Sequence, residues 1–107
     1  EESIAKKFAK NNDVVLVLKS DHTIVTDGLK FYKNEIGNPG MATAGVGDVL
    51  TGVIASLMKR LEPFEAAKLG VYIHSLAGDI ASEKLGEDSL IATDVIENLS
   101  EAIKRLR

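Results

Sequence analysis

A glycine-rich loop that runs directly into an apolar pattern of helical period constrains this chain most: Asn38-Pro-Gly-Met-Ala-Thr-Ala-Gly-Val-Gly-Asp-Val-Leu-Thr-Gly52. Gly45 and Gly47 permit backbone angles closed to other residues and leave room for a ligand beside the chain. The helix predicted over roughly residues 48–60 points its unpaired N–H groups and positive dipole end at this loop. Such a corner favours phosphate or another anion. Asp48 is the acid beside it, which indicates chemistry as well as binding.

Before the loop, the pattern predicts one helix and three strands. Residues 3–10 have a helical pattern with Ser3 as N-cap. Val14–Leu18 is a continuous β-branched apolar run, typical of a strand buried on both faces in a parallel sheet. Residues 23–26 and 29–34 are predicted as a hairpin around an Asp-Gly turn. Because a parallel strand needs parallel partners, we expect an N-terminal piece or a second chain to complete the sheet.

After the loop, the sequence is helical. One apolar stripe follows Asp48, and Pro63 then begins a helix that is apolar on most faces and ends at Gly86. Gly70 within this helix permits close packing. Thr93 is the expected N-cap of a final amphipathic helix. The chain is therefore predicted to be an α/β protein with the order α, β, β, β and three helices.

Composition excludes several classes of function. The 107 residues suffice for one small domain that buries a core without disulfides or metal. A net charge of −3 and the lack of a basic stripe argue against nucleic acid or an anionic membrane as partner. There is no cysteine for a disulfide or a zinc–thiolate site. With no apolar run long enough to span a bilayer, we expect a cytoplasmic protein.

The Gly-x-Gly-Asp motif alone leaves two interpretations open. The plainer one is an ordinary helix start at which Asp48 caps free N–H groups. Gly37 and Gly40 upstream, and the hydroxyls of Thr43 and Thr51, favour an anion site instead. The motif lacks the Gly-Lys-Ser/Thr ending of a Walker loop and the spacing of a dinucleotide fingerprint.

The loop closely resembles the signature of the NAD(P)H-hydrate dehydratases, repair enzymes of the ribokinase-like superfamily. The resemblance continues in Glu65-Ala-Ala and in Gly70-Val-Tyr-Ile-His-Ser-Leu-Ala-Gly-Asp79, and upstream in Leu18-Lys-Ser-Asp-His-Thr23. It covers essentially the whole chain. At three positions the family usually carries glycine where this chain has another small residue: Ser20, Ala44 and Ser75.

The resemblance implies a fold, an activity and an assembly. Residues 1–107 would be the C-terminal portion of a single ribokinase-like catalytic domain with a three-layer α/β fold, and the N-terminal substrate-binding half would be absent. The activity would be dehydration of hydrated NAD(P)H to NAD(P)H, by phosphorylation of the hydrate hydroxyl and elimination, with ADP or ATP as phosphoryl donor. Mg²⁺ is implied by that chemistry, although no residue is identified as its ligand. A homo-oligomer is expected.

The resemblance also assigns site residues. The nucleotide would contact Lys19, Ser20, Asp21, His22 and Thr23, chiefly through Lys19 and Thr23, and its AMP part would lie against Gly47. The N–H groups of Ala44, Gly45, Val46 and Gly47 would form an anion hole. Asp48 would approach the hydrated nicotinamide ring and act as the base.

Alternatives remain open on the sequence alone. The same corner would serve a ribokinase-like kinase of a thiazole or pyrimidine alcohol, or a non-catalytic nucleotide-binding fragment. Without the resemblance, Lys19 is a solvated strand-end lysine and His22 a loop residue. His74 is interpreted as a hydrogen-bonded core histidine, and Asp79 as a residue with a local partner. The choice between ADP and ATP, and a fused epimerase domain, are not determined.

Overall fold

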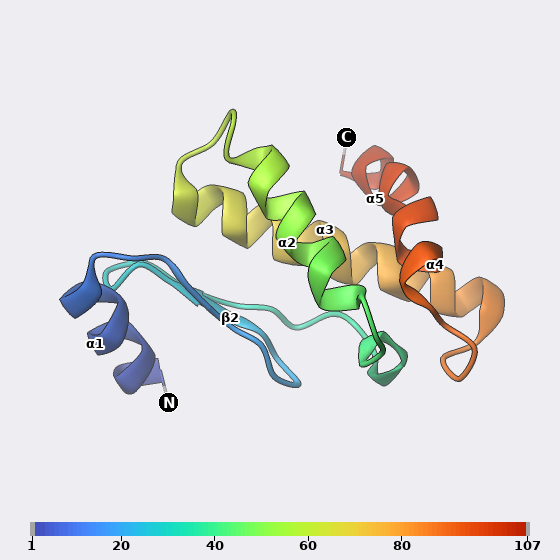
Figure 1. Cartoon of the computed structure of the whole chain (residues 1–107), viewed down its shortest axis with the longest axis horizontal. Helices are drawn as coiled ribbons and strands as arrows, with labels where there is room; N and C mark the ends of the chain where they lie inside the picture. Colours follow the sequence, from blue (N-terminus) through green and yellow to red (C-terminus); the bar gives the residue numbers. More distant parts are fainter. Residues whose placement is uncertain (1, 107) are drawn as a thin grey trace.

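A computed structural model describes residues 2–106, with a small sheet at one end and packed helices at the other (Figure 1). The sheet has the order β1-β2-β3 and is antiparallel throughout. Its strands are β1 (Leu16–Leu18), β2 (Ile24–Thr26) and β3 (Phe31–Lys33). Beside it lies α1 (Glu2–Asn12), which extends past Ser3 and so places that residue inside the helix instead of at its N-cap.

The predicted hairpin is confirmed, because β2 pairs with β3 in the register Val25↔Tyr32. Its turn is closed by the Asp27 carboxylate, which accepts hydrogen bonds from the N–H groups of Lys30 at 2.7 Å and Leu29 at 2.9 Å. These two bonds hold the pKa of Asp27 below its usual value.

The prediction of a parallel strand buried on both faces is wrong for this chain. Residues 14 and 15 lie outside β1, and β1 pairs antiparallel with β2, with Val17 opposite Val25. Leu16 and Val17 are only half-buried, and Leu18 is exposed. The physical reason is the loop over residues 19–23, which is too short for the crossover that joins parallel strands.

The helices pack around α3 (Pro63–Leu85), which crosses behind α2 (Val46–Leu57) in Figure 1. The predicted close packing at Gly70 is confirmed, since a Cβ there would lie 2.7 Å from Cγ1 of Ile54 on α2. One core cluster joins the sheet to both helices through Val25, Leu50, Phe64, Ala67 and Val71. A second joins α2 and α3 to the C-terminal helices through Val46, Ile73, Ala77, Ile80, Val95 and Ala102.

The final helix is not continuous. It is divided into α4 (Ala92–Glu97) and α5 (Leu99–Arg105), and the N-cap is Ile91, not Thr93. The N–H of Ile91 donates to the Asp94 carboxylate at 2.9 Å. Asn98 lies buried at the junction, where its amide donates to the Asp94 carbonyl at 2.7 Å and accepts from Lys84 at 2.8 Å. This local bonding offers the backbone an alternative to a continuous helix.

Among residues 2–106, no helix is long and apolar enough to cross a membrane.

Candidate active site

A cavity of about 1230 Å³ lies where the β1–β2 loop, the glycine-rich loop and the start of α2 meet α3. The β1–β2 loop contributes residues 19–23 to its wall, β2 contributes Ile24, and the segment after β3 contributes residues 36–39. The glycine-rich loop with its short 3-10 helix η1 (Pro39–Met41) adds residues 41–44, and α2 adds Val46 and Gly47. His74 and Ser75 line it from α3. The cavity thus gathers segments far apart in the sequence.

The glycine-rich loop ends in a helix N-terminus that leaves donors free. α2 begins at Val46, two residues before the predicted start, with Gly45 as N-cap in a left-handed conformation (φ 86°, ψ −15°). The N–H of Val46 donates to Thr43 O at 3.3 Å, and the first bond of the helical ladder runs from Val49 N–H to Gly45 O at 3.1 Å. The N–H groups of Gly47 and Asp48 precede that bond, so they have no partner inside the helix.

Lys19 lies over this helix N-terminus. A Cβ placed on Gly47 would lie 2.5 Å from Lys19 Nζ, so a larger residue at position 47 would displace the ammonium group from this point. In the part of the chain that the structure describes, none of the ion pairs involves Lys19. The lysine charge and the positive end of the α2 dipole therefore meet at one point without an acidic side chain paired to the lysine. This arrangement attracts an anion.

His74 supports the same corner from α3. Its side chain is buried, and its Nε2–H donates to the carbonyl of Val46 at 3.0 Å. Burial lowers the pKa of His74, the bond to Val46 opposes this shift, and the nearby Lys19 charge adds to it. The prediction of a hydrogen-bonded core histidine is confirmed, and the ring also forms part of the cavity wall.

Asp48 and Gly45 lie beside this cavity but do not line it. Asp48 occupies the first turn of α2 with an exposed side chain. Within residues 2–106 no hydrogen bond or ion pair joins the Asp48 carboxylate to another side chain. Thr43 lines the cavity, whereas the Thr51 hydroxyl donates to Gly47 O at 3.2 Å and is thus used within the helix.

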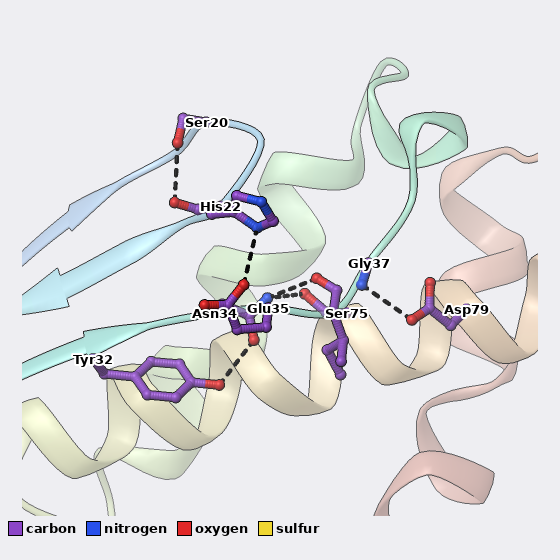
Figure 2. A network of polar contacts seen from close by, with 9 residues as sticks. Ser20, His22, Tyr32, Asn34, Glu35, Gly37, Ser75 and Asp79 are labelled. Carbon is purple, nitrogen blue, oxygen red and sulfur yellow. Dashed lines mark hydrogen bonds and ion pairs between the residues drawn. The ribbon is translucent and has the colours of Figure 1, made fainter.

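The five residues predicted to contact a nucleotide, Lys19 to Thr23, all line the cavity. Ser20 Oγ donates to His22 O at 3.0 Å, which shapes the loop. His22 Nδ1 lies 3.7 Å from Glu35 Oε1 across the gap to the segment after β3 (Figure 2). Of the predicted anion-hole residues, Ala44, Val46 and Gly47 also line the cavity.

A polar network in the cavity wall was not predicted. Asn34 donates to Ser75 Oγ at 2.8 Å and to Ile36 O at 3.0 Å, and accepts from the Tyr32 hydroxyl at 2.8 Å (Figure 2). Asp79 bonds to the segment at Gly37 and Asn38, 42 and 41 residues away, so the prediction of a local partner is wrong. The available signal was the presence of polar residues on a face of α3 that is otherwise buried.

The described residues do not form a metal site by themselves, because no three His, Asp or Glu side chains come together. Magnesium is commonly bound by one or two carboxylates together with phosphate oxygens and water, so a bound nucleotide would supply part of its ligands.

Comparison with known proteins identifies relatives. The family model described as NAD(P)H-hydrate dehydratase matches residues 1–101. The bifunctional NAD(P)H-hydrate repair enzyme Nnr of Moorella thermoacetica is 45% identical over 106 residues, which are 96% of this chain and 20% of that protein. The chain thus spans about a fifth of the length of the curated relatives it matches.

Two solved structures share the fold. The ADP/ATP-dependent NAD(P)H-hydrate dehydratase from Bacillus subtilis, co-crystallized with ATP/Mg²⁺, superposes with a TM-score of 0.92 at 28% identity, over 99% of this chain and 39% of that one. A ribokinase-like superfamily protein from Enterococcus faecalis V583 gives 0.80 at 32% identity, over 94% of this chain and 35% of that one. The predicted α/β fold of ribokinase-like type is thereby confirmed. The family match over residues 1–101 and these similarities show that the chain belongs to the NAD(P)H-hydrate dehydratase family.

Proposed function

We propose that this chain forms part of an enzyme that dehydrates hydrated NAD(P)H to NAD(P)H, with ADP or ATP as phosphoryl donor. The observation that carries the proposal is the meeting of Lys19 and the N-terminus of α2 at the cavity wall, with no carboxylate paired to the lysine among the described residues. Nucleotide phosphates supply the negative charge that this corner attracts. The proposal includes a cytoplasmic location.

In this proposal the cavity holds the nucleotide. Lys19 contacts its phosphates, together with Ser20, Asp21, His22 and Thr23 on the same loop, and the AMP part lies against Gly47. The N–H groups of Ala44, Gly45 and Gly47 donate to the transferring phosphoryl group, whereas the N–H of Val46 bonds to Thr43 O. Magnesium, when bound, neutralises phosphate charge and is held in part by phosphate oxygens.

Asp48 is proposed as the base. It accepts the proton of the hydrate hydroxyl while that oxygen attacks the terminal phosphorus and the bond to the departing nucleotide breaks. Elimination of phosphate from the phosphorylated hydrate, with loss of a proton from the adjacent carbon, then forms the carbon–carbon double bond of NAD(P)H. Because Asp48 is exposed beside the cavity, we propose that residues outside this chain provide the wall that holds the hydrated ring.

The test compares two variants of the complete protein. Asp48→Asn is expected to abolish the return of reduced-nicotinamide absorbance from hydrated NADH plus ADP, while calorimetry still detects ADP binding. Lys19→Ala is expected to weaken ADP binding by roughly tenfold or more, since bonds to charged groups contribute about 1.5–3 kcal/mol. Lys7→Ala, at an exposed position on α1, controls for loss of charge. A normal rate for Asp48→Asn would show that Asp48 is not the base.

A ribokinase-like kinase is the second candidate, favoured by the similarity to the Enterococcus faecalis protein. Such an enzyme would use the same corner and release a phosphorylated alcohol. Mass spectrometry of the products distinguishes the two, because a dehydratase releases free phosphate and a kinase retains it on the substrate.

A further inference from the structure

Asp79 lies behind the cavity wall without lining it. It is half-buried on α3, and its two carboxylate oxygens bond to neighbouring residues of the segment after β3. Oδ2 accepts from Gly37 N–H at 3.0 Å, and Oδ1 accepts from the Asn38 amide at 2.8 Å. Figure 2 shows the first of these bonds, as a dashed line from Gly37 to Asp79 on α3. Charge-assisted bonds of this kind are stronger than those between neutral groups.

The bond to Asn38 fixes which way that amide faces. With its nitrogen directed to Asp79, Asn38 presents Oδ1 to Gly40 N–H at 3.0 Å and so caps η1. Met41, the last residue of η1, packs directly against Gly78, next to Asp79 on α3. From there the chain passes into residues 42–44 of the cavity wall and on to the N-terminus of α2. One carboxylate therefore sets the start of the whole loop.

We propose that Asp79 is a positioning residue that holds residues 37–44 against α3 through Gly37 and Asn38. The expected effect on nucleotide binding rests on the proposed function, because the loop that Asp79 holds lines the proposed nucleotide cavity. A loop released from α3 occupies its binding-competent position for only a fraction of the time. The apparent affinity for nucleotide falls by that fraction, so KM rises while kcat changes little.

The structure offers a test by exchange of the two partners. In Asp79→Asn, an NH2 group replaces one of the two carboxylate oxygens, so either Gly37 N–H or the Asn38 amide loses its acceptor. In Asn38→Asp, two carboxylates face each other. In the double variant the amide at position 79 can accept from Gly37 N–H through its oxygen and donate through its nitrogen to the carboxylate at position 38. The second oxygen of that carboxylate accepts from Gly40 N–H, so all three hydrogen bonds are restored, with donor and acceptor reversed between the two side chains. Glu83→Gln, which removes one negative charge from an exposed position on α3, is the control.

Hydrogen–deuterium exchange and steady-state kinetics are measured on the complete protein, well below the melting temperature of each variant. We expect roughly tenfold faster exchange over residues 36–44 in each single variant, and roughly tenfold higher KM for ADP, with both restored toward wild type in the double variant. Unchanged exchange in Asp79→Asn, or a double variant no better than the single ones, would overturn the inference. Lack of ADP binding by the wild type would instead refute the proposed function, and the exchange data would then decide the role of Asp79 alone.

Discussion

His74 is an ionisable side chain that the fold buries, so its protonation links stability to pH. Burial lowers the pKa of His74, and Lys19 lowers it further, while its bond to Val46 O opposes the shift. The folded protein therefore keeps this ring neutral at pH values at which the unfolded chain, with a pKa of about 6.5, becomes protonated. The unfolded state binds more protons, so stability falls as pH decreases below about 6.5 and levels off below the folded-state pKa.

His74→Gln removes this titration and keeps an N–H donor for Val46 O. We expect the variant to be less stable than wild type at about pH 7.5, because a tightly packed ring is replaced, and the difference to narrow as the pH falls to about 5.5. Urea denaturation at a series of pH values measures both stabilities. Parallel pH profiles for the two proteins would show that His74 does not titrate differently in the folded and unfolded states.

At the scale of single residues, the sequence predicted which residues belong to the site better than it predicted which residues they contact. The glycine-rich motif drew attention to Gly47, and the family resemblance to Lys19, and the structure brings these two together. The bond between Asp79 and Gly37 spans 42 residues of sequence, and no local pattern specifies which distant donor a carboxylate will meet. The bond from Asn34 to Ser75 spans 41 residues and escaped prediction for the same reason.

At the scale of elements, the N-terminus of α2 depends on one backbone conformation. Gly45 has a φ of 86°, which side chains disfavour by roughly 1–2 kcal/mol, and a Cβ there would lie 3.2 Å from Cβ of Ala92. Gly52 lies in the same helix at an exposed position, and a Cβ there would meet nothing within 4 Å. The two glycines therefore respond to the same substitution in opposite ways.

Gly45→Ala is expected to destabilise the protein by roughly 1–2 kcal/mol. Gly52→Ala is expected to stabilise it by about 0.5–1 kcal/mol, because alanine loses less entropy than glycine in a helix. Guanidinium denaturation of both variants in the complete protein measures the two changes. A stabilising effect of Gly45→Ala would show that α2 does not require the left-handed conformation at its start.

The elements were predictable where local chemistry determines them. Pro63 and Gly86 bound α3 as predicted, and the Asp-Gly turn produced the hairpin. The antiparallel pairing of β1 was not predictable from its apolar run, because such a run indicates burial and does not identify the strand that pairs with it. The break between α4 and α5 at Asn98 was also not predicted. The sequence pattern is helical on both sides of Asn98, and the break depends on side-chain bonds of Asn98 to Asp94 and Lys84 that the pattern does not show.

At the scale of the whole molecule, the sheet end differs from the helical end. In the part that the structure describes, the sheet has three short strands, and β1 pairs on one side only. On the neighbouring α1, Ala5 and Ala9 are buried against the rest of the chain, while Ile4 and Phe8 are 74% and 52% exposed. The apolar side chains of α1 therefore do not all share one buried face. Exposed apolar side chains beside an unpaired strand edge favour association.

Such a surface favours a covering partner, and either the homo-oligomer that the family resemblance implies or a further segment of the longer protein would provide one. We expect the 107-residue chain, expressed by itself, to self-associate through this end, with a sedimentation coefficient that rises with concentration. Ile4→Glu places a charge within the apolar surface and is expected to shift the equilibrium toward monomer. Ser3→Glu adds the same charge at the adjacent exposed polar position and is expected to change association less. If the two variants sediment alike, the association is governed by net charge or by another surface, and α1 is not its contact.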